Sequence, residues 1–317
     1  MGAVNLNFMK NNVYTCNFGA MGTSFGMVLS GIIGHKGDLV ISDIREEIER
    51  IEEMLSLYDP GSEVFLLNQS PSGVPVEVSG ELFKLIEECL GFNRAVCGAF
   101  DISLRVLTEY WNRIEKLNKP VNVITDESTR LLAGAGMDKV ELFPDESKVA
   151  LHGRAKLDFG GAGKGYALNK VSSILDLHGV ENCFISFGDS SIMTRGNHPN
   201  GNCWKVGVPD PFNNEKEVIE KELKNCSVST SGNTVNNSIR GRVNVINPFT
   251  GLPEKGMRTA FVSHKNPLIA EILSTAILIL DNKSVQSVLE KFEGAEASKI
   301  EYINEKPEIT EFTNKNL

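Results

Sequence analysis

Apolar residues recur at helical intervals along much of the chain. Ile44 and Ile48 lie four positions apart within such a pattern, which predicts an amphipathic helix that ends before Pro60. The same period predicts a second helix, with Ser79 as its N-cap and Gly98 as its C-cap. Further helices are expected over residues 101–118, after Thr125, from about 165 to 179, over 266–280 and over 282–294.

Segments rich in β-branched and aromatic residues lie between these helices. Residues 14–31 are expected to form one or two strands around a tight bend. Other strands are expected before residue 143 and within 182–188, 203–211, 227–236, 241–256 and 258–264. Helices and strands mix without a repeat or a strict β-α-β order, which is typical of an α+β protein with a mixed, largely antiparallel sheet flanked by helices.

No stretch rich in Pro, Gly or Ser divides the chain. We therefore expect a single compact domain over residues 14–300, followed by a polar C-terminal tail over residues 301–317. The composition, with 41% hydrophobic and 23% charged residues among 317, is that of a globular protein. The net charge of -9 and the lack of a basic run argue against nucleic-acid binding, so a small anionic ligand must be met by local groups.

The cysteines and the N-terminus bear on the cell compartment. None of the six cysteines forms a C-x-x-C pair, so reduced and mostly buried thiols are expected. Residues 1–16 contain no apolar core of a signal peptide, and no stretch reaches the roughly 18 apolar residues of a transmembrane segment. These features predict a cytoplasmic protein, although an exported protein that has lost its leader would share them.

The stretch "LDFGGAGKGYALNKV" combines a glycine-rich turn with the start of a predicted helix. Its spacing fits neither the phosphate-binding P-loop nor the dinucleotide fingerprint, in which Tyr166 would have to be glycine. Glycines still allow a ligand to approach the backbone, and the first N–H groups of a helix attract anions. Lys164 would add a cation and Asp158 an acceptor. A tight turn with a solvated Lys164 explains the pattern equally well.

Two polar residues stand out in the strongly apolar stretch 266–280. Glu271 and Thr275 are four positions apart, so a helix places them on one face. A buried carboxylate needs a cation or hydrogen-bond donors, and oxygen ligands of this kind suit Mg²⁺ or Ca²⁺. The alternative is that Glu271 is exposed in the first turn of the helix, where the helix dipole favours it.

A second polar cluster surrounds Ser231. Thr230, Ser231 and Gly232, with Asn233 and Asn244 nearby in sequence, could bind phosphate or sugar or could simply form a turn. No histidine partner for Ser231 is evident, so a serine nucleophile is unsupported. The five histidines show no spacing typical of metal ligands.

Taken in order, these segments resemble the FAD:protein FMN transferases, the ApbE-type family. The resemblance runs from about Tyr14 to Leu280. The matching motifs are "AMGTSF", "LYDPGSEVFLLN", "GAFDISLRVLTEYW", "LDFGGAGKGYALNKV", "ISFGDSSIMTRG", "WKVGVPDP", "STSGN", "INPFTG" and "AEILSTAIL".

The resemblance implies a flavin-binding α+β fold and a magnesium-dependent reaction. FMN is transferred from FAD to a Thr or Ser of an acceptor protein, and AMP is released. The implied FAD-binding residues are Met21, Tyr58, Ala99, Phe100, Asp101, Asp158, Lys164 and Ile246. The implied metal ligands are the Gly161 carbonyl, the Glu271 carboxylate and the Thr275 hydroxyl.

The chain departs from the family pattern at three positions. Asn244 stands where the family has the histidine taken to activate the acceptor hydroxyl, and Asn247 replaces an aspartate of the same motif. Glu271 replaces an aspartate, which keeps the charge but adds one methylene. Because an amide is not a useful base near neutral pH, two alternatives stay open: a non-catalytic FAD-binding member and an FAD pyrophosphatase that yields FMN and AMP.

Overall fold

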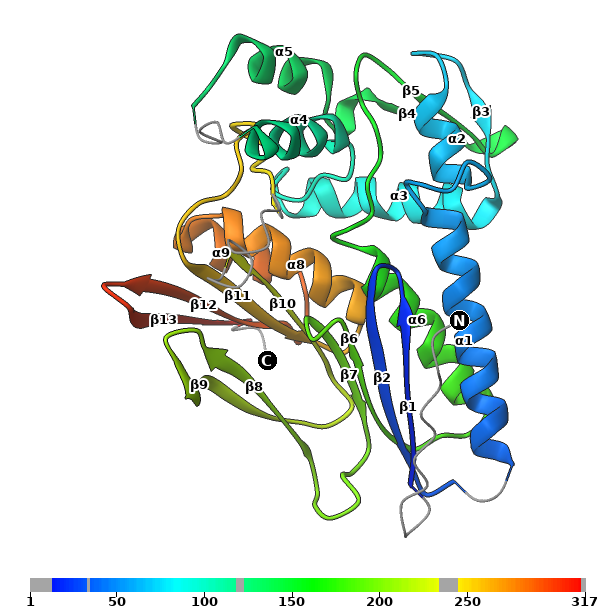
Figure 1. The fold of residues 1–317 in the computed structure, drawn as a ribbon, viewed down its shortest axis with the longest axis vertical. Coiled ribbons are helices and arrows are strands. Elements are labelled where there is room, and N and C mark those ends of the chain that lie inside the picture. The colour runs from blue at the N-terminus through cyan, green and yellow to red at the C-terminus, as the bar shows by residue number, and fades with distance from the viewer. Residues whose placement is uncertain (1–12, 33–34, 118–122, 234–244, 315–317) are drawn as a thin grey trace.

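An eight-stranded antiparallel sheet forms the centre of the computed structural model, which describes residues 13–32, 35–117, 123–233 and 245–314 (Figure 1). The strand order is β1-β2-β6-β7-β10-β11-β12-β13. The strands are β1 (Val13–Ala20), β2 (Thr23–Ser30), β6 (Asn182–Phe187), β7 (Ser191–Arg195), β10 (Ser227–Asn233), β11 (Arg258–His264), β12 (Glu296–Ile303) and β13 (Lys306–Thr313). The predicted fold class is confirmed.

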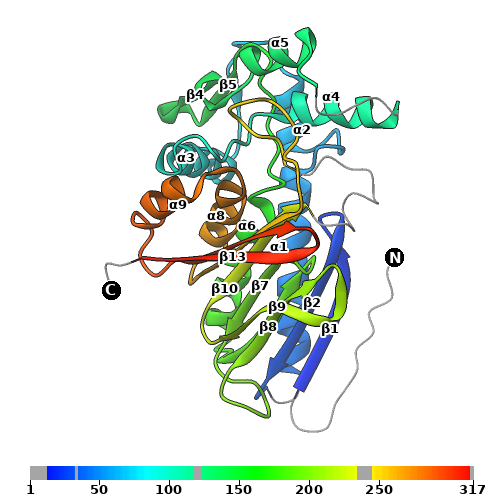
Figure 2. The same cartoon turned by 90° about the vertical axis from the view of Figure 1, so that its left-hand side faces the viewer.

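Three helices cover one face of this sheet (Figure 2). They are α1 (Lys36–Leu55), α6 (Gly163–Leu177) and α8 (Pro267–Ile279). α8 packs on β10 and β11, and α6 lies between α8 and α1. Ile44 and Ile48 of α1 are fully buried, as their helical spacing predicts. Because α6 begins at the glycine-rich stretch, this packing fixes the glycine loop against the first turns of α8.

Part of the opposite face is covered by a hairpin of β8 (Trp204–Asp210) and β9 (Asn213–Leu223). Val206 and Ile219 of the hairpin share a core with Val228 and Phe261 of the sheet. Ala260, next to Phe261 along β11, belongs instead to the larger core under the helices. This alternation shows that the sheet is buried on both faces at β10 and β11.

Shorter elements form a layer beyond the ends of the sheet strands (Figure 1). α3 (Gly80–Ala95) begins at the predicted cap, where the Ser79 hydroxyl accepts from the Leu82 N–H at 3.1 Å. The other elements of this layer are α2 (Glu63–Gln69), β3 (Val76–Glu77), α4 (Arg105–Lys116), α5 (Asp126–Gly134), β4 (Val140–Phe143) and β5 (Lys148–Leu151). α9 (Asn282–Leu289) packs beside β13.

Secondary structure differs from the sequence-based prediction in several places. The elements α2, β3, β5, β7 and β12 (Glu296–Ile303) have no counterpart in the prediction, and the strand expected within 241–256 is not formed over its described residues, 245–256. Residues 306–313, expected in a polar tail, form the edge strand β13, whose side chains are almost all exposed. The strand β9 has no counterpart in the prediction, since its charged residues hide the alternation of Ile219 and Leu223 toward the core. No helix within the described ranges is long and apolar enough to span a membrane.

Candidate active site

A cavity of about 510 Å³ opens between the glycine loop, the start of α4, β10 and the middle of α8. It brings together segments that are far apart in sequence. Nine of the predicted ligand residues line it: Ala99, Phe100, Asp101, Asp158, Gly161, Lys164, Ile246, Glu271 and Thr275.

The glycine loop is a tight turn that ends in the first turn of α6. One Asp158 oxygen accepts from the Gly160 N–H at 2.9 Å, and the other accepts from the Arg105 guanidinium at 3.2 Å. The turn then closes through the Gly163 N–H, which donates to the Phe159 carbonyl at 2.7 Å. Asp158 is therefore held in one orientation at the cavity wall, with Arg105 beside it as a second cation.

Glu271 is buried, with only 3% of its surface exposed. One carboxylate oxygen accepts from the Lys164 ammonium, and the other accepts from the Gly165 N–H at 2.6 Å. The alternative of an exposed Glu271 in the first turn of α8 is thus wrong. Burial of the carboxylate is compensated by a cation and a backbone donor from the glycine loop.

The Thr275 hydroxyl lies one turn further along α8. It donates to the Glu271 carbonyl at 3.3 Å and is 3.3 Å from the Ser231 hydroxyl of β10. The Gly161 backbone is adjacent, because a Cβ at this glycine would stand 3.4 Å from the Thr275 hydroxyl oxygen. Thr230, Ser231 and Gly232 of the predicted polar cluster therefore line the cavity.

The oxygen atoms at this point are of the chemical types that bind a hard divalent cation. Glu271, Thr275 and the Gly161 carbonyl would supply a carboxylate, a hydroxyl and a carbonyl oxygen, which are the ligands that Mg²⁺ prefers. No cluster of three or more His, Cys, Asp or Glu side chains in the described ranges is arranged to hold a metal. Water molecules and substrate oxygens would supply the further ligands of the cation.

Asp101 has a structural function in addition to its place at the cavity. Its carboxylate accepts from the Ser103 N–H at 2.7 Å, from the Ser103 hydroxyl at 2.6 Å and from the Met137 N–H at 3.2 Å. Burial raises the pKa of Asp101, and these hydrogen bonds oppose that shift. The side chain ties the segment before α4 to the residues that precede β4.

Met21 and Tyr58 are not among the residues that line the cavity. Met21, with a φ of 49° in the bend between β1 and β2, reaches Gly163 at the start of α6. Tyr58 is 79% exposed, and the Arg105 guanidinium lies 5.7 Å from the centre of its ring. Both side chains are therefore near the glycine loop or the cavity rim, and their flavin contacts stay predictions.

The segment that contains Asn244 and Asn247 is described only in part, because Asn244 lies outside the described residues. Asn247 accepts from the Phe249 N–H at 2.9 Å and donates to Glu254 at 2.7 Å, so its side chain holds its own loop. Ile246 from the same loop lines the cavity. No histidine lines the cavity within the described part of the chain.

Arg105 is a site residue that the sequence analysis missed. It is the first residue of α4, and its guanidinium forms ion pairs with Asp158 and Glu109. A single arginine in an amphipathic helix carries no local signal. Only the packing of α4 against the glycine loop places it at the cavity.

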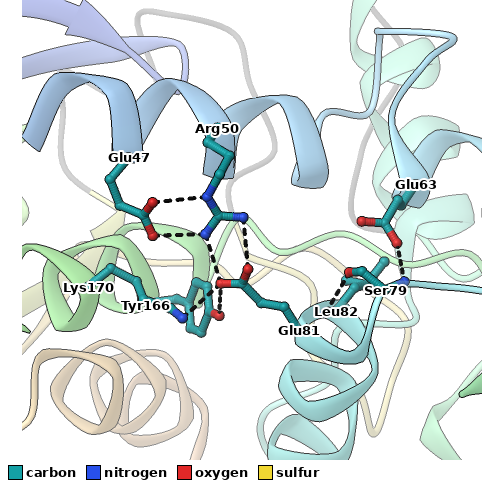
Figure 3. A network of polar contacts seen from close by, with 8 residues as sticks. All are labelled: Glu47, Arg50, Glu63, Ser79, Glu81, Leu82, Tyr166 and Lys170. Carbon is teal, nitrogen blue, oxygen red and sulfur yellow. Dashed lines mark hydrogen bonds and ion pairs between the residues drawn. The ribbon is translucent and has the colours of Figure 1, made fainter. Parts of the chain in front are cut away.

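A partly exposed ionic cluster connects the glycine-loop helix to its neighbours (Figure 3). Glu81 of α3 accepts from the Tyr166 hydroxyl at 2.5 Å and pairs with Lys170 at 2.8 Å, both on α6. Arg50 of α1 pairs with Glu81 at 2.7 Å and with Glu47 at 2.8 Å. Three helices thus meet at one carboxylate, close to the start of α6.

We expect Glu81→Gln to destabilise the protein by about 1–2 kcal/mol at pH 7, because Arg50 and Lys170 are partly exposed and solvent screens their attraction to the carboxylate. Burial alone would raise the pKa of Glu81, but hydrogen bonds from Arg50, Lys170 and Tyr166 outweigh it and lower the pKa to about 2. A lowered pKa stabilises the fold above the ordinary value of 4.5, and this contribution is lost as the pH falls toward 2. Urea unfolding across this range measures it.

The exposed Glu87, on the same helix, provides the matched control for Glu81. Glu87→Gln should leave the unfolding free energy near that of the unaltered protein. The difference between Glu81→Gln and the unaltered protein should shrink as the pH is lowered. A difference that stays constant with pH would show that the carboxylate charge is not what stabilises the cluster.

The chain matches a known family and several known proteins. The family model described as the ApbE family matches residues 21–298. The FAD:protein FMN transferase of Haemophilus influenzae is 22% identical over 283 residues, which cover 86% of this chain and 82% of that protein. The FAD:protein FMN transferase of Vibrio cholerae is 25% identical over 256 residues, or 78% and 75% of the two chains.

Solved structures show the same architecture. The crystal structure of the ApbE protein from Thermotoga maritima has a TM-score of 0.81 and 26% identity, and it covers 95% of this chain and 97% of that one. The apo flavinyl transferase ApbE of Pseudomonas stutzeri also has a TM-score of 0.81, at 21% identity, with 98% and 97% covered. Since the family model spans most of the sequence, the protein belongs to the ApbE family.

Proposed function

We propose that this protein transfers FMN from FAD to a Thr or Ser hydroxyl of an acceptor protein, with release of AMP and in a magnesium-dependent manner. The observation that carries the proposal is the single cavity in which the glycine loop meets Glu271 and Thr275. Membership of the ApbE family and relatives named FAD:protein FMN transferase support the same reaction.

The proposed reaction exchanges one bond to phosphorus for another. The acceptor hydroxyl oxygen bonds to the phosphorus of the FMN half, and the P–O bond between the two phosphates breaks. AMP leaves with that electron pair, and the hydroxyl proton passes to solvent or to a base. Such transfers depend mostly on positioning and on neutralising phosphate charge.

The chain offers suitable groups for both tasks. Lys164 and Arg105 bring positive charge to the cavity, where the FAD diphosphate would lie. Asp158, fixed by Arg105 and the Gly160 N–H, would orient a polar group of FAD. Gly161, Glu271 and Thr275 would hold the magnesium ion, which when bound would neutralise diphosphate oxygens and favour departure of AMP.

The proposal is tested by incubating the protein with FAD, Mg²⁺ and a candidate acceptor protein. Covalent flavin is read from fluorescence of the acceptor band after denaturing electrophoresis. We expect labelling that requires FAD, an acceptor Thr or Ser, and Mg²⁺, and that stops when EDTA is added. Replacing the acceptor Thr with Val is the matched control.

The alternatives give different outcomes in the same assay. AMP and FMN formed without labelling would support an FAD pyrophosphatase. FAD binding without either product, across a panel of acceptors, would support a non-catalytic flavin-binding protein. Both outcomes would contradict the proposed transfer, and the amide at Asn244 is the sequence feature that makes them worth testing.

We expect Asn244→His to raise the transfer rate, by up to the 10²–10⁴-fold that general-base help typically contributes, or about 3–5 kcal/mol. The reason is that histidine can accept the acceptor proton near neutral pH, whereas an amide cannot. Initial rates of acceptor labelling between pH 6 and 9 measure the effect. An unchanged rate and pH profile would show that transfer here does not depend on a base at this position.

A further inference from the structure

Both oxygens of the Glu271 carboxylate are already engaged within the protein. Lys164 donates to one oxygen, and the Gly165 N–H donates to the other at 2.6 Å. The side chain of Glu271 is 4% exposed, whereas that of Lys164 is 20% exposed. A metal ion that binds this carboxylate must therefore share or displace one of the two donors.

The two donors differ in their freedom to move. Gly165, in the first turn of α6, lies directly against the start of α8. A Cβ at Gly165 would stand 2.6 Å from the Pro267 carbonyl oxygen and 2.7 Å from the Leu268 Cα. Its N–H cannot withdraw from Glu271 without separating the two helices. Lys164 has a long, flexible side chain that reaches the cavity. Lys164 is the donor that can leave.

We propose that Lys164 is the built-in counterion of Glu271 and exchanges partners when substrate binds. With the cavity empty, its ammonium neutralises the buried carboxylate, which would otherwise be costly. When the divalent cation and FAD bind, the cation takes over the carboxylate and the ammonium turns to the diphosphate. This inference rests on the proposed function, because it assigns the FAD and metal sites to the same cavity.

The exchange couples the two ligands. A metal ion that binds without FAD must displace the Lys164 ammonium from Glu271 and leave that ammonium without a partner. The affinity for metal alone is therefore weak. FAD supplies the anion that receives the ammonium, so FAD and metal strengthen each other's binding, as linkage requires. Lys164 is thus a positioning residue for the metal and a contact residue for FAD.

The test is Lys164→Met, with Lys170→Met as the matched control. Lys170 is on the same helix but pairs with Glu81. Calorimetric titration with Mg²⁺ alone should give an affinity about tenfold tighter for Lys164→Met than for the unaltered protein. Titration with FAD in saturating Mg²⁺ should give an affinity about tenfold weaker. Lys170→Met should change neither affinity appreciably.

Thermal unfolding provides a readout that does not depend on activity. In EDTA, Lys164→Met should have a lower Tm than the unaltered protein. Added Mg²⁺ should raise the Tm of Lys164→Met by more than it raises the Tm of the unaltered protein. Lys164→Arg keeps the charge and should retain both the Tm and the weak affinity for Mg²⁺. This conservative variant distinguishes loss of the counterion from a general folding defect.

Some results would overturn the inference. If Lys164→Met binds Mg²⁺ with unchanged or weaker affinity, Lys164 does not compete with the metal at Glu271. Failure of the proposed function is distinguishable, because it would appear as absent FMN transfer by the unaltered protein. The opposite shifts in Mg²⁺ and FAD affinity are measured without any acceptor or turnover.

Discussion

Glu271→Gln is expected to slow FMN transfer by at least about 10²-fold, the usual effect of losing one preorganised charged group at a reacting centre. The carboxylate is buried, and Lys164 and the Gly165 N–H both point at it. An amide at this position cannot neutralise Lys164 or offer the charge that a divalent cation needs. Initial rates at saturating FAD and Mg²⁺ measure the loss.

Two further variants separate charge from other effects of this change. Glu220→Gln removes an exposed carboxylate that pairs with Lys205 far from the cavity, and it should transfer FMN at the unaltered rate. Glu271→Asp keeps the charge but shortens the reach by one methylene, and it should retain part of the activity. Full activity of Glu271→Gln would show that the carboxylate takes no part in transfer.

Gly165→Ala is expected to destabilise the fold by about 3 kcal/mol or more, at the upper end of overpacking effects. The added methyl carbon would lie 2.6 Å from the Pro267 carbonyl oxygen and 2.7 Å from the Leu268 Cα. Both contacts are with backbone, so no side-chain rotation relieves them. α6 and α8 would have to separate, and Glu271 would lose its backbone donor. Chemical denaturation measures the loss.

Gly91→Ala provides the matched control for Gly165→Ala. Gly91 is inside α3, and a Cβ there would meet no atom within 4 Å. Alanine should therefore be neutral or stabilise the protein by about 0.5–1 kcal/mol, through its higher helix propensity. Equal stability of the two alanine variants would contradict the close approach of α6 to α8.

Local patterns allowed much of the fold to be predicted. The period of Ile44 and Ile48 predicts α1, because helical spacing is a property of neighbouring residues. The glycine loop and the helix after it follow from the same kind of signal. The strand β9 escaped prediction because Ile219 and Leu223 are separated by charged residues that face solvent. Its burial depends on the sheet beneath it.

The site could be predicted only in part, for a similar reason. Whether Glu271 is buried depends on how α6 docks against α8, and no local pattern encodes that contact. The sequence therefore left an exposed Glu271 as an alternative, which the Lys164 and Gly165 contacts exclude. Arg105 escaped notice because its partner Asp158 is 53 positions away.

The most direct test of the proposed function is the ratio of AMP released to acceptor flavinylated. Both are measured in one reaction, AMP by chromatography and flavinylation by the intact mass of the acceptor. Transfer from FAD predicts one AMP for each FMN-bearing acceptor, with the phosphoester on a Thr or Ser. AMP released in excess with no mass change of the acceptor would contradict transfer and would indicate hydrolysis of FAD.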